Sequence, residues 1–201
     1  MNNIVIIGAG GHASACIDVI EMQGDYKIAG LVDNMRLTSK SGYPIIGNDD
    51  DLPDLRKKYD YALIAIGQIK SPNLRKNIFN LLNELKFILP VIISPKSYVS
   101  KNSNIKSGSV IMHDVVINAG ASIGYNCIIN SKTLIEHDVS VGNNCHISTG
   151  AIINGGVSIG DNNFIGSGVV TRQNINIANN CIIGAGKVLM ANVKSNEVLK
   201  N

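Results

Sequence analysis

Residues 134–153 read LIEHDVSVGNNCHISTGAII and carry Ile or Val at every sixth position, from Ile135 to Ile153. The same spacing extends from Val99 to Leu189, where fifteen of sixteen positions are Val, Ile or Leu and only Thr171 departs. An α-helix has an apolar period of about 3.6 residues and a strand a period of about 2, so neither explains this pattern. A hexapeptide repeat predicts a parallel β-helix.

The residues between the apolar positions are typical of tight corners. Two positions before each apolar residue the side chain is small or modestly apolar, as in Ala121, Cys127 and Val139. Gly, Asn and Asp follow the apolar residues at 142–144 and 160–162, and these residue types tolerate the positive φ of corners. Three units would close one triangular coil. A β-sandwich is also rich in Val and Ile, but its irregular strands would not keep this phase.

Composition limits the possible functions. The chain has 201 residues, enough for one large or two small domains, and its 45% hydrophobic content suffices for a core. A net charge of +3 without a block of Lys or Arg gives no indication of nucleic acid binding. We find no signal-peptide pattern and no apolar run of about 18 residues, so we expect a cytoplasmic protein without membrane insertion.

The cysteines and histidines do not form a recognisable metal site. Three of the four cysteines occupy the small-residue position of the repeat, where we interpret them as core fillers rather than disulfides or ligands. Some β-helix enzymes bind zinc through three histidines, but the separations of 24 and 9 residues here do not match, and we expect no metal. His113 has no obvious partner, and we expect it to be structural or solvated.

The first 95 residues alternate between strand and helix patterns, which predicts a small parallel sheet flanked by helices, a half-Rossmann domain. The expected strands are 3–8, 26–33, 61–67 and 87–93, with a short strand at 43–47, and the expected helices are 13–22, 51–59 and 71–85. Ser71 is the expected N-cap of the last helix and Pro72 its first residue. We therefore predict two domains, 1–95 and 96–201.

A glycine turn follows the first strand. Gly8, Gly10 and Ala13 fit G-x-G-x-x-A, and Asp33 lies at the end of the second strand. Such a turn lets main-chain N–H groups approach a phosphate at a helix N-terminus. Four strands are too few for a dinucleotide, so the turn either holds a nucleotide-linked ligand or binds nothing. His12, within it, could cap main-chain groups or contact a ligand.

One corner of the repeat departs from the Gly-Asp-Asn pattern. His137 lies two residues after the inward Ile135 and is flanked by Glu136 and Asp138. A neutral imidazole beside a carboxylate is the usual arrangement of a general base, although an exposed corner residue would have the same sequence. His146 precedes an inward Ile and is expected to face outward.

The chain resembles bacterial sugar acetyltransferases of the left-handed β-helix superfamily, in the group with the nucleotide-aminosugar N-acetyltransferases of bacillosamine synthesis and the sialic-acid O-acetyltransferases. The motifs that carry the resemblance are IVIIGAGGHA, LVDN, AIGQIKSPNLRKNIF, LIEHDVSVGNNCHISTGAIINGG and NNFIGSGVVTRQNINIANNCIIGAGKVL. The resemblance implies a left-handed helix, a homotrimer, acetyl-CoA between neighbouring β-helices and a nucleotide sugar on the N-terminal domain. Many members carry His-Pro where this chain has Ser94-Pro95, and Cys where it has Val139.

The resemblance also implies roles for individual residues. His137 corresponds to the catalytic base and Asp138 to its acidic partner. The positions that correspond to acetyl-CoA contacts are His146, Gly155 and Ala185. The positions that correspond to substrate contacts are Gly10, Gly11, His12, Asp33 and Asn130.

The function that we expect from the resemblance is acetyl transfer from acetyl-CoA to the amine of a UDP-4-amino-dideoxy sugar, in bacterial surface glycan biosynthesis. One alternative is O-acetylation of a sialic acid or a related nonulosonic acid. A nucleotide-sugar-binding scaffold without catalysis and a β-helix metalloenzyme are alternatives from other classes.

Overall fold

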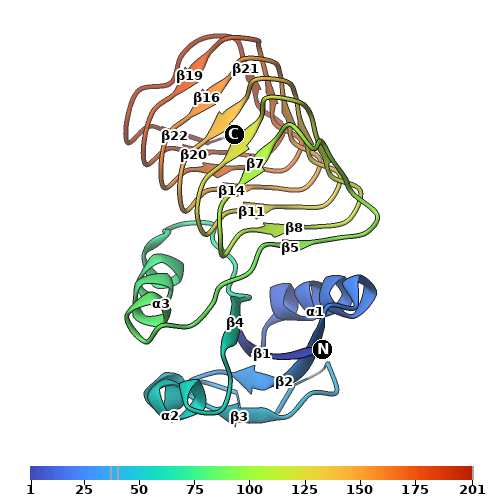
Figure 1. Cartoon of the computed structure of the whole chain (residues 1–201). Coiled ribbons are helices and arrows are strands. Elements are labelled where there is room, and N and C mark those ends of the chain that lie inside the picture. Colours follow the sequence, from blue (N-terminus) through green and yellow to red (C-terminus); the bar gives the residue numbers. More distant parts are fainter. Residues whose placement is uncertain (37, 40, 201) are drawn as a thin grey trace.

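The structure is a computed structural model that describes residues 1–36, 38–39 and 41–200. A small α/β domain precedes a long triangular β-helix and lies against its first coils (Figure 1). Among the described residues, none of the helices has both the length and the apolar character needed to cross a bilayer.

The N-terminal sheet has four parallel strands in the order β3-β2-β1-β4. Ile4 and Ile6 of β1 pack with α1 on one face, and Val5 and Ile7 pack with α2 and α3 on the other. This explains why residues 4–7 of β1 are an unbroken apolar run. The elements are β1 (Asn2–Ile7), α1 (Gly11–Gln23), β2 (Tyr26–Val32), β3 (Ile45–Gly47), the 3-10 helix η1 (Asp49–Asp51), α2 (Leu52–Arg56), β4 (Tyr61–Ile64) and α3 (Asn73–Glu84).

Two expectations for this domain were wrong. The segment 87–93 is not a strand of the sheet: Ile88 makes one bridge to Tyr61, and Ile92–Ile93 belongs to the β-helix. Pro90 interrupts the segment and has no N–H for a ladder. Ser71 is not the N-cap of α3 and Pro72 is not its first residue, because Pro72 is the N-cap and α3 begins at Asn73. Ser71 Oγ nevertheless accepts a hydrogen bond from Asn73 N at 3.2 Å.

The β-helix consists of three parallel sheets, which we name by their first strands. The β5 sheet contains β5 (Ile92–Ile93), β8 (Val110–Ile111), β11 (Ile128–Ile129), β14 (His146–Ile147), β17 (Phe164–Ile165), β20 (Ile182–Ile183) and β22 (Val198–Leu199). The β6 sheet contains β6 (Tyr98–Val99), β9 (Val116–Ile117), β12 (Leu134–Ile135), β15 (Ile152–Ile153), β18 (Val170–Thr171) and β21 (Val188–Leu189). The β7 sheet contains β7 (Asn104–Ile105), β10 (Ser122–Ile123), β13 (Ser140–Val141), β16 (Ser158–Ile159) and β19 (Asn176–Ile177).

The register follows the repeat, since Ile128 pairs with His146, 18 residues later. The last coil is two residues shorter, because Ile182 pairs with Val198. The hexapeptide pattern and the resemblance together predicted this left-handed parallel β-helix, and the fold confirms that prediction. The first strand of the β-helix begins at Ile92, whereas the domain boundary at residue 95 stays a prediction.

The inward aliphatic side chains form one continuous buried core along the β-helix. The four cysteines are free and buried, and the three in the repeat, Cys127, Cys145 and Cys181, belong to this core, as expected for core fillers. Cys127 and Cys145 donate their thiols to the carbonyl oxygens of Gly142 and Gly160, each at 3.1 Å, so the polar sulfur groups of this corner are satisfied.

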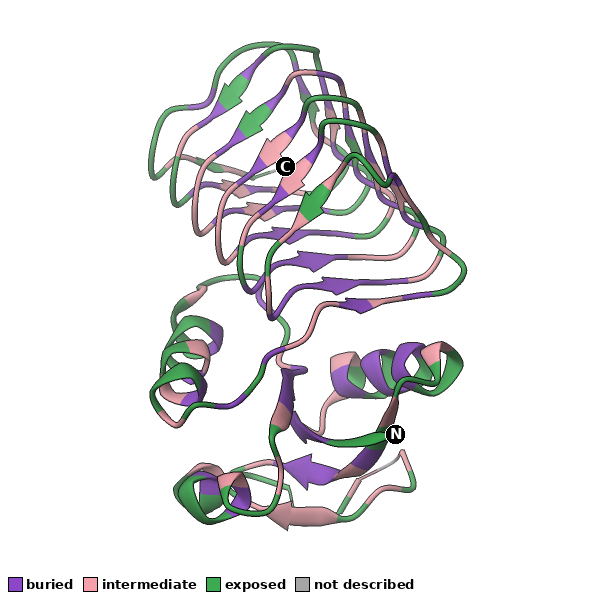
Figure 2. Cartoon of the chain, viewed as in Figure 1, coloured by how far each residue is buried: buried purple, intermediate pink, exposed green. Residues whose placement is uncertain are grey.

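The two domains share a core and a polar contact. Ile92 and Met112 of the first coils pack against the residues of α1. Figure 2 shows buried segments both in α1 and in the strands of the coils next to it. His113 Nδ1 lies 2.6 Å from Ser94 Oγ, and its Nε2 lies 2.7 Å from Asp18 Oδ2 of α1. His113 therefore has partners that its sequence context did not reveal, and one of them is in the other domain.

We predict that Ile123→Ala lowers the free energy of unfolding by about 2–5 kcal/mol, because a fully buried side chain leaves a cavity in a stacked core. The neighbouring Ser122→Ala, on the outward face of the same strand, changes it by less than about 0.5 kcal/mol. Denaturant unfolding followed by circular dichroism measures both variants. Equal losses would contradict the inward assignment.

Candidate functional site

The glycine turn brings the end of β1 against β4. Gly8 has a φ of 109°, and a Cβ there would lie 3.0 Å from Ile66 Cγ1, so a larger residue would be strained at this position. Gly10 is the N-cap of α1 and Gly11 its first residue, and neither carries a side chain that would hinder a ligand at the helix N-terminus.

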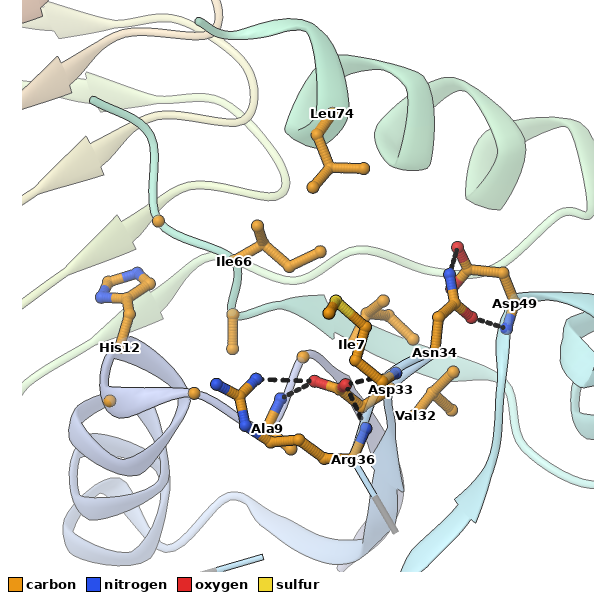
Figure 3. A pocket seen from close by; sticks show the side chains of 16 residues that line it. Ile7, Ala9, His12, Val32, Asp33, Asn34, Arg36, Asp49, Ile66 and Leu74 are labelled. Carbon is orange, nitrogen blue, oxygen red and sulfur yellow. Dashed lines mark hydrogen bonds and ion pairs between the residues drawn. The ribbon is translucent and has the colours of Figure 1, made fainter. Parts of the chain in front are cut away.

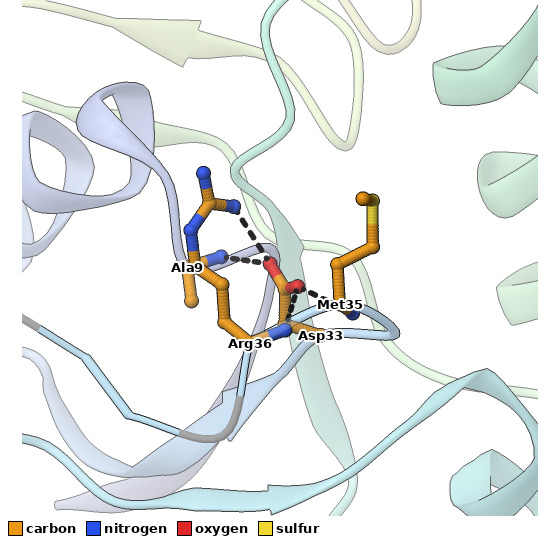
Figure 4. A network of polar contacts seen from close by, with 4 residues as sticks. All are labelled: Ala9, Asp33, Met35 and Arg36. Atoms are coloured by element: carbon orange, nitrogen blue, oxygen red, sulfur yellow. Dashed lines mark hydrogen bonds and ion pairs between the residues drawn. The ribbon is translucent and has the colours of Figure 1, made fainter.

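Asp33 anchors this turn to the end of β2. Its carboxylate accepts hydrogen bonds from the N–H groups of Ala9, Met35 and Arg36, each at 2.9 Å, and its Oδ2 lies 3.4 Å from Arg36 Nη1 (Figure 4). Burial raises the pKa of Asp33, but these N–H donors outweigh it and leave the pKa below its usual value. Asp33 is therefore an ionised, largely occupied acceptor that shapes the turn.

A cavity of about 330 Å³ opens at this turn (Figure 3). The predicted substrate residues Gly10, Gly11, His12 and Asp33 all line it. Ile66, at the end of β4, contributes to an apolar wall opposite the polar Asp33 network. A cleft of this kind, at the carboxyl ends of parallel strands, is where open α/β sheets bind ligands.

A second cavity, of about 600 Å³, adjoins the first and shares His12 and Gly67 with it. It lies between α1, the segment after β4 and the β5 sheet, and it brings His12 together with Asn130 and His146. Gly67 and three further residues, Ala15, Gln68 and Ile69, complete its lining.

His146 faces away from the coil, as expected, but the N-terminal domain buries it. Its Nδ1 lies 2.5 Å from the carbonyl oxygen of Gln68, which can only accept, so Nδ1 carries the proton. Nε2 is then an acceptor, 3.4 Å from Asn130 Nδ2. Burial lowers the pKa of His146, which favours this neutral form. In this form His146 cannot donate from Nε2.

His12 is half-buried and is also neutral. Its Nε2 lies 3.5 Å from Cys16 Sγ, one helical turn later on α1. Burial, with smaller contributions from Arg75 and His146, lowers the pKa of His12 to about 3. The second cavity therefore contains two imidazoles that remain uncharged at neutral pH.

His137 has the opposite character. It lies at the edge between the β6 and β7 sheets, and its Nδ1 is 2.9 Å from Asp138 Oδ2. The side chains are 65% and 72% exposed, so the hydrogen-bonded pair faces solvent. The hydrogen bond to Asp138 raises the pKa of His137. An imidazole bonded to a carboxylate through Nδ1 leaves Nε2 to exchange protons.

Gly155 lies one coil beyond His137 at the same edge. A Cβ at Gly155 would be 2.7 Å from His137 Nε2, so only glycine leaves room for the ring in this position. The N–H of Gly156 bonds the carbonyl oxygen of His137 at 3.0 Å, which fixes the corner. Asn118 Nδ2 donates to Glu136 Oε2 at 2.9 Å.

The remaining predicted residues are distributed over different edges of the prism. Ala185 lies at the edge between the β5 and β6 sheets, whereas His137, Asp138 and Gly155 share the edge between the β6 and β7 sheets. That second edge is opposite the β5 sheet, on which the N-terminal domain packs (Figure 1). One chain therefore does not bring His137 to either cavity.

Sequence reasoning missed two residues of the site. Gln68 follows the buried strand β4 and reaches the β-helix through its Nε2, which donates to Asn144 O at 2.8 Å. Its position after a parallel strand is a usable signal, but its partners are 76 and 78 residues away. Arg36, which pairs with Asp33, was detectable only as a charge near the predicted carboxylate.

No group of three or more His, Cys, Asp or Glu side chains suited to a metal ion occurs among the residues that the structure describes. The chemistry available is that of two neutral imidazoles, an exposed imidazole–carboxylate pair and main-chain N–H groups.

Comparison with known proteins gives matches over both domains. Residues 3–82 match the PglD N-terminal domain, and residues 138–173 match the bacterial transferase hexapeptide (six repeats). UDP-N-acetylbacillosamine N-acetyltransferase of Bacillus subtilis (strain 168) is 30% identical over 113 residues. That match spans 56% of this chain and 52% of the relative, about half the length of each.

Several solved structures match over the whole chain. A mutant of perosamine N-acetyltransferase from Caulobacter crescentus, in complex with CoA and GDP-perosamine, is 30% identical with a TM-score of 0.94, covering 100% of this chain and 94% of that one. The acetyltransferase domain of PglB from Neisseria gonorrhoeae FA1090, in complex with acetyl coenzyme A, is 29% identical with a TM-score of 0.93, covering 100% and 97%. The chain belongs to the family of hexapeptide-repeat sugar acetyltransferases that carry a PglD-type N-terminal domain.

Proposed function

We propose that the protein is an acetyltransferase that transfers the acetyl group of acetyl-CoA to the amine of a nucleotide-activated amino sugar. The observation that carries this proposal is the His137–Asp138 pair, with Nδ1 bonded to the carboxylate and Nε2 available as a base. Relatives that match the full chain are described with CoA and GDP-perosamine or with acetyl coenzyme A. We assign the reaction to bacterial surface glycan biosynthesis in the cytoplasm.

The two connected cavities suit the two parts of such a substrate. The glycine turn, with Gly10 and Gly11 at the N-terminus of α1, would hold the diphosphate. The sugar would extend past His12 into the second cavity, toward Asn130 and His146. A UDP-4-amino-dideoxy sugar is the substrate that we favour.

We also propose a homotrimer, because the outward surfaces of the three sheets differ. The outward residues of the β7 sheet are all Ser or Asn: Asn104, Ser122, Ser140, Ser158 and Asn176. Those of the β6 sheet are all apolar: Tyr98, Val116, Leu134, Ile152, Val170 and Val188. An apolar face along a whole prism is a natural contact for further copies of the chain.

Packing through the β6 sheets would complete the site. Each copy would bring the edge with His137 and Gly155 toward the edge of its neighbour that carries Ala185, beside the neighbour's β5 sheet and N-terminal domain. Acetyl-CoA would lie in the groove between these edges. This arrangement explains why His137 is remote from both cavities within one chain.

The proposed reaction uses His137 as a base and then as an acid. His137 Nε2 takes the proton from the sugar amine as the N–C bond forms at the acetyl carbonyl. It returns that proton to the sulfur as the C–S bond breaks. Asp138 holds the Nδ1–H and stabilises the charged imidazole in between. His146, an Nε2 acceptor, would orient the acceptor group rather than donate to the acetyl carbonyl.

The activity is tested by incubating acetyl-CoA with UDP-amino sugars, GDP-amino sugars and free or CMP-linked sialic acids, and by measuring thiol release together with the acetylated product. We expect turnover with the nucleotide-linked amino sugars. Turnover with a sialic acid alone would favour O-acetylation, and thiol release with none of them would favour a binding scaffold.

We predict that His137→Ala lowers kcat by about 10²–10⁴-fold while the trimer and substrate binding persist, because only the proton transfer is lost. Steady-state kinetics at saturating substrates measures this effect. A kcat near that of the wild type would contradict the assignment.

We predict that Asp138→Asn shifts the acidic limb of the pH profile of kcat/KM to lower pH and lowers the maximum. The base must be neutral, and the carboxylate raises the pKa of His137, so the wild-type rate falls as pH drops through that raised pKa. Asp114→Asn is the matched control, because Asp114 also follows a histidine and also has a positive φ, 58° against 59°. A shift in the control but not in Asp138→Asn would overturn the assignment.

We predict that Val188→Glu dissociates the trimer and abolishes activity, since Val188 is 63% exposed on the apolar face and a buried carboxylate would lack a partner. Ser158→Glu, outward on the β7 sheet, leaves both unchanged. Analytical ultracentrifugation reports the assembly and circular dichroism the fold. Full activity of a monomeric variant would refute the shared site.

A further inference from the structure

Arg75 is a buried guanidinium that joins the two domains. It extends from α3 and is 1% exposed. Nη1 donates to the carbonyl oxygens of Ile64 and Ile66, at 2.6 and 3.0 Å, at the end of β4. Nη2 and Nε reach the carbonyl oxygens of Gly108 and Asn126 of the β-helix, both at 3.3 Å. Arg75 therefore fixes the cavity wall to the first coils.

This cation has no acidic partner. The ion pairs of the described residues do not include Arg75. The titratable groups whose pKa the charge of Arg75 lowers are the imidazoles of His12 and His146 and the thiols of Cys16 and Cys127. Burial lowers the pKa of Arg75 to about 10, so it is still charged at neutral pH.

An unpaired charge in a dry interior acts strongly on its surroundings, because little water screens it. Two of these groups, His12 and His146, line the second cavity. Ile66, whose carbonyl oxygen accepts a hydrogen bond from Arg75, lines the first cavity. Arg75 itself lines neither cavity, so no ligand in them could neutralise it by direct contact.

We propose that Arg75 is a positioning residue that gives the second cavity a positive potential, so that an acceptor amine bound there stays unprotonated and negative charge developing on the acetyl oxygen is favoured. A positive charge disfavours an ammonium ion, and only the neutral amine has a lone pair with which to attack a thioester. This inference rests on the proposed function. The positive charge adds to burial, which is the larger cause, in keeping both cavity histidines uncharged.

The first test needs no acetyl transfer and therefore does not depend on the proposed function. NMR titration of the histidine rings in the wild-type protein should show the pKa of His12 and of His146 below the usual histidine value, with His137 titrating above that value as the internal reference. If His12 or His146 titrates at or above about 6.5, the positive potential is absent and the proposal is wrong.

The second test separates charge from structure. Arg75→Met should raise the pKa of both histidines and lower kcat about tenfold. It should also move the acidic limb of the pH profile to higher pH, because the acceptor amine is then protonated more readily. Arg75→Lys should keep the histidine pKa values near those of the wild type. Arg56→Met, which removes an arginine paired with Asp60 at 2.6 Å, is the control and should change neither. A lower thermal midpoint in Arg75→Met with unchanged histidine titration would mean that Arg75 is only structural. If Arg75→Met does not fold, the histidine titrations of the wild type and of Arg75→Lys test the proposal instead.

Discussion

The structure depends on one constraint, the stacking of inward aliphatic side chains in parallel register at intervals of 18 residues. Because each coil satisfies its main-chain hydrogen bonds with the coils before and after it, the prism needs little from its outward side chains. These are therefore free to differ from sheet to sheet. One sheet receives the N-terminal domain, one is apolar and one is polar, and the proposed assembly follows from this division.

The sequence predicted most of the architecture because its signals are local or periodic. The six-residue spacing, the β1–turn–α1 unit and the free cysteines all follow from residue types at fixed intervals. The short segment 87–93 was misplaced because an apolar run of this length carries no information about which sheet it joins. Ile92 and Ile93 pair with Val110 and Ile111 of the β-helix, a choice made by the neighbouring coil.

The site was less predictable because its contacts cross between domains. The cavity at the glycine turn is lined by residues that the motif predicted: Gly10, Gly11, His12 and Asp33. The contacts of Gln68 and Arg75 with the β-helix, by contrast, join residues 33 to 78 positions apart. His146 illustrates the difficulty: its outward direction follows from the repeat, whereas its protonated nitrogen depends on a carbonyl in the other domain. No pattern along the chain encodes such a pairing.

The two His-Asp dipeptides have a broader consequence. His113 and His137 are 24 residues apart, which displaces one from the other by one coil and one edge. Both ring nitrogens of His113 are hydrogen-bonded, to Ser94 and Asp18, whereas His137 faces solvent and is bonded to the aspartate that follows it. On this scaffold the coil and the edge at which a residue lies determine its surroundings. The same dipeptide therefore joins the two domains at one position and is a solvent-exposed, reactive pair at another. New sites could therefore arise by moving a motif six residues along the chain, without any change of fold.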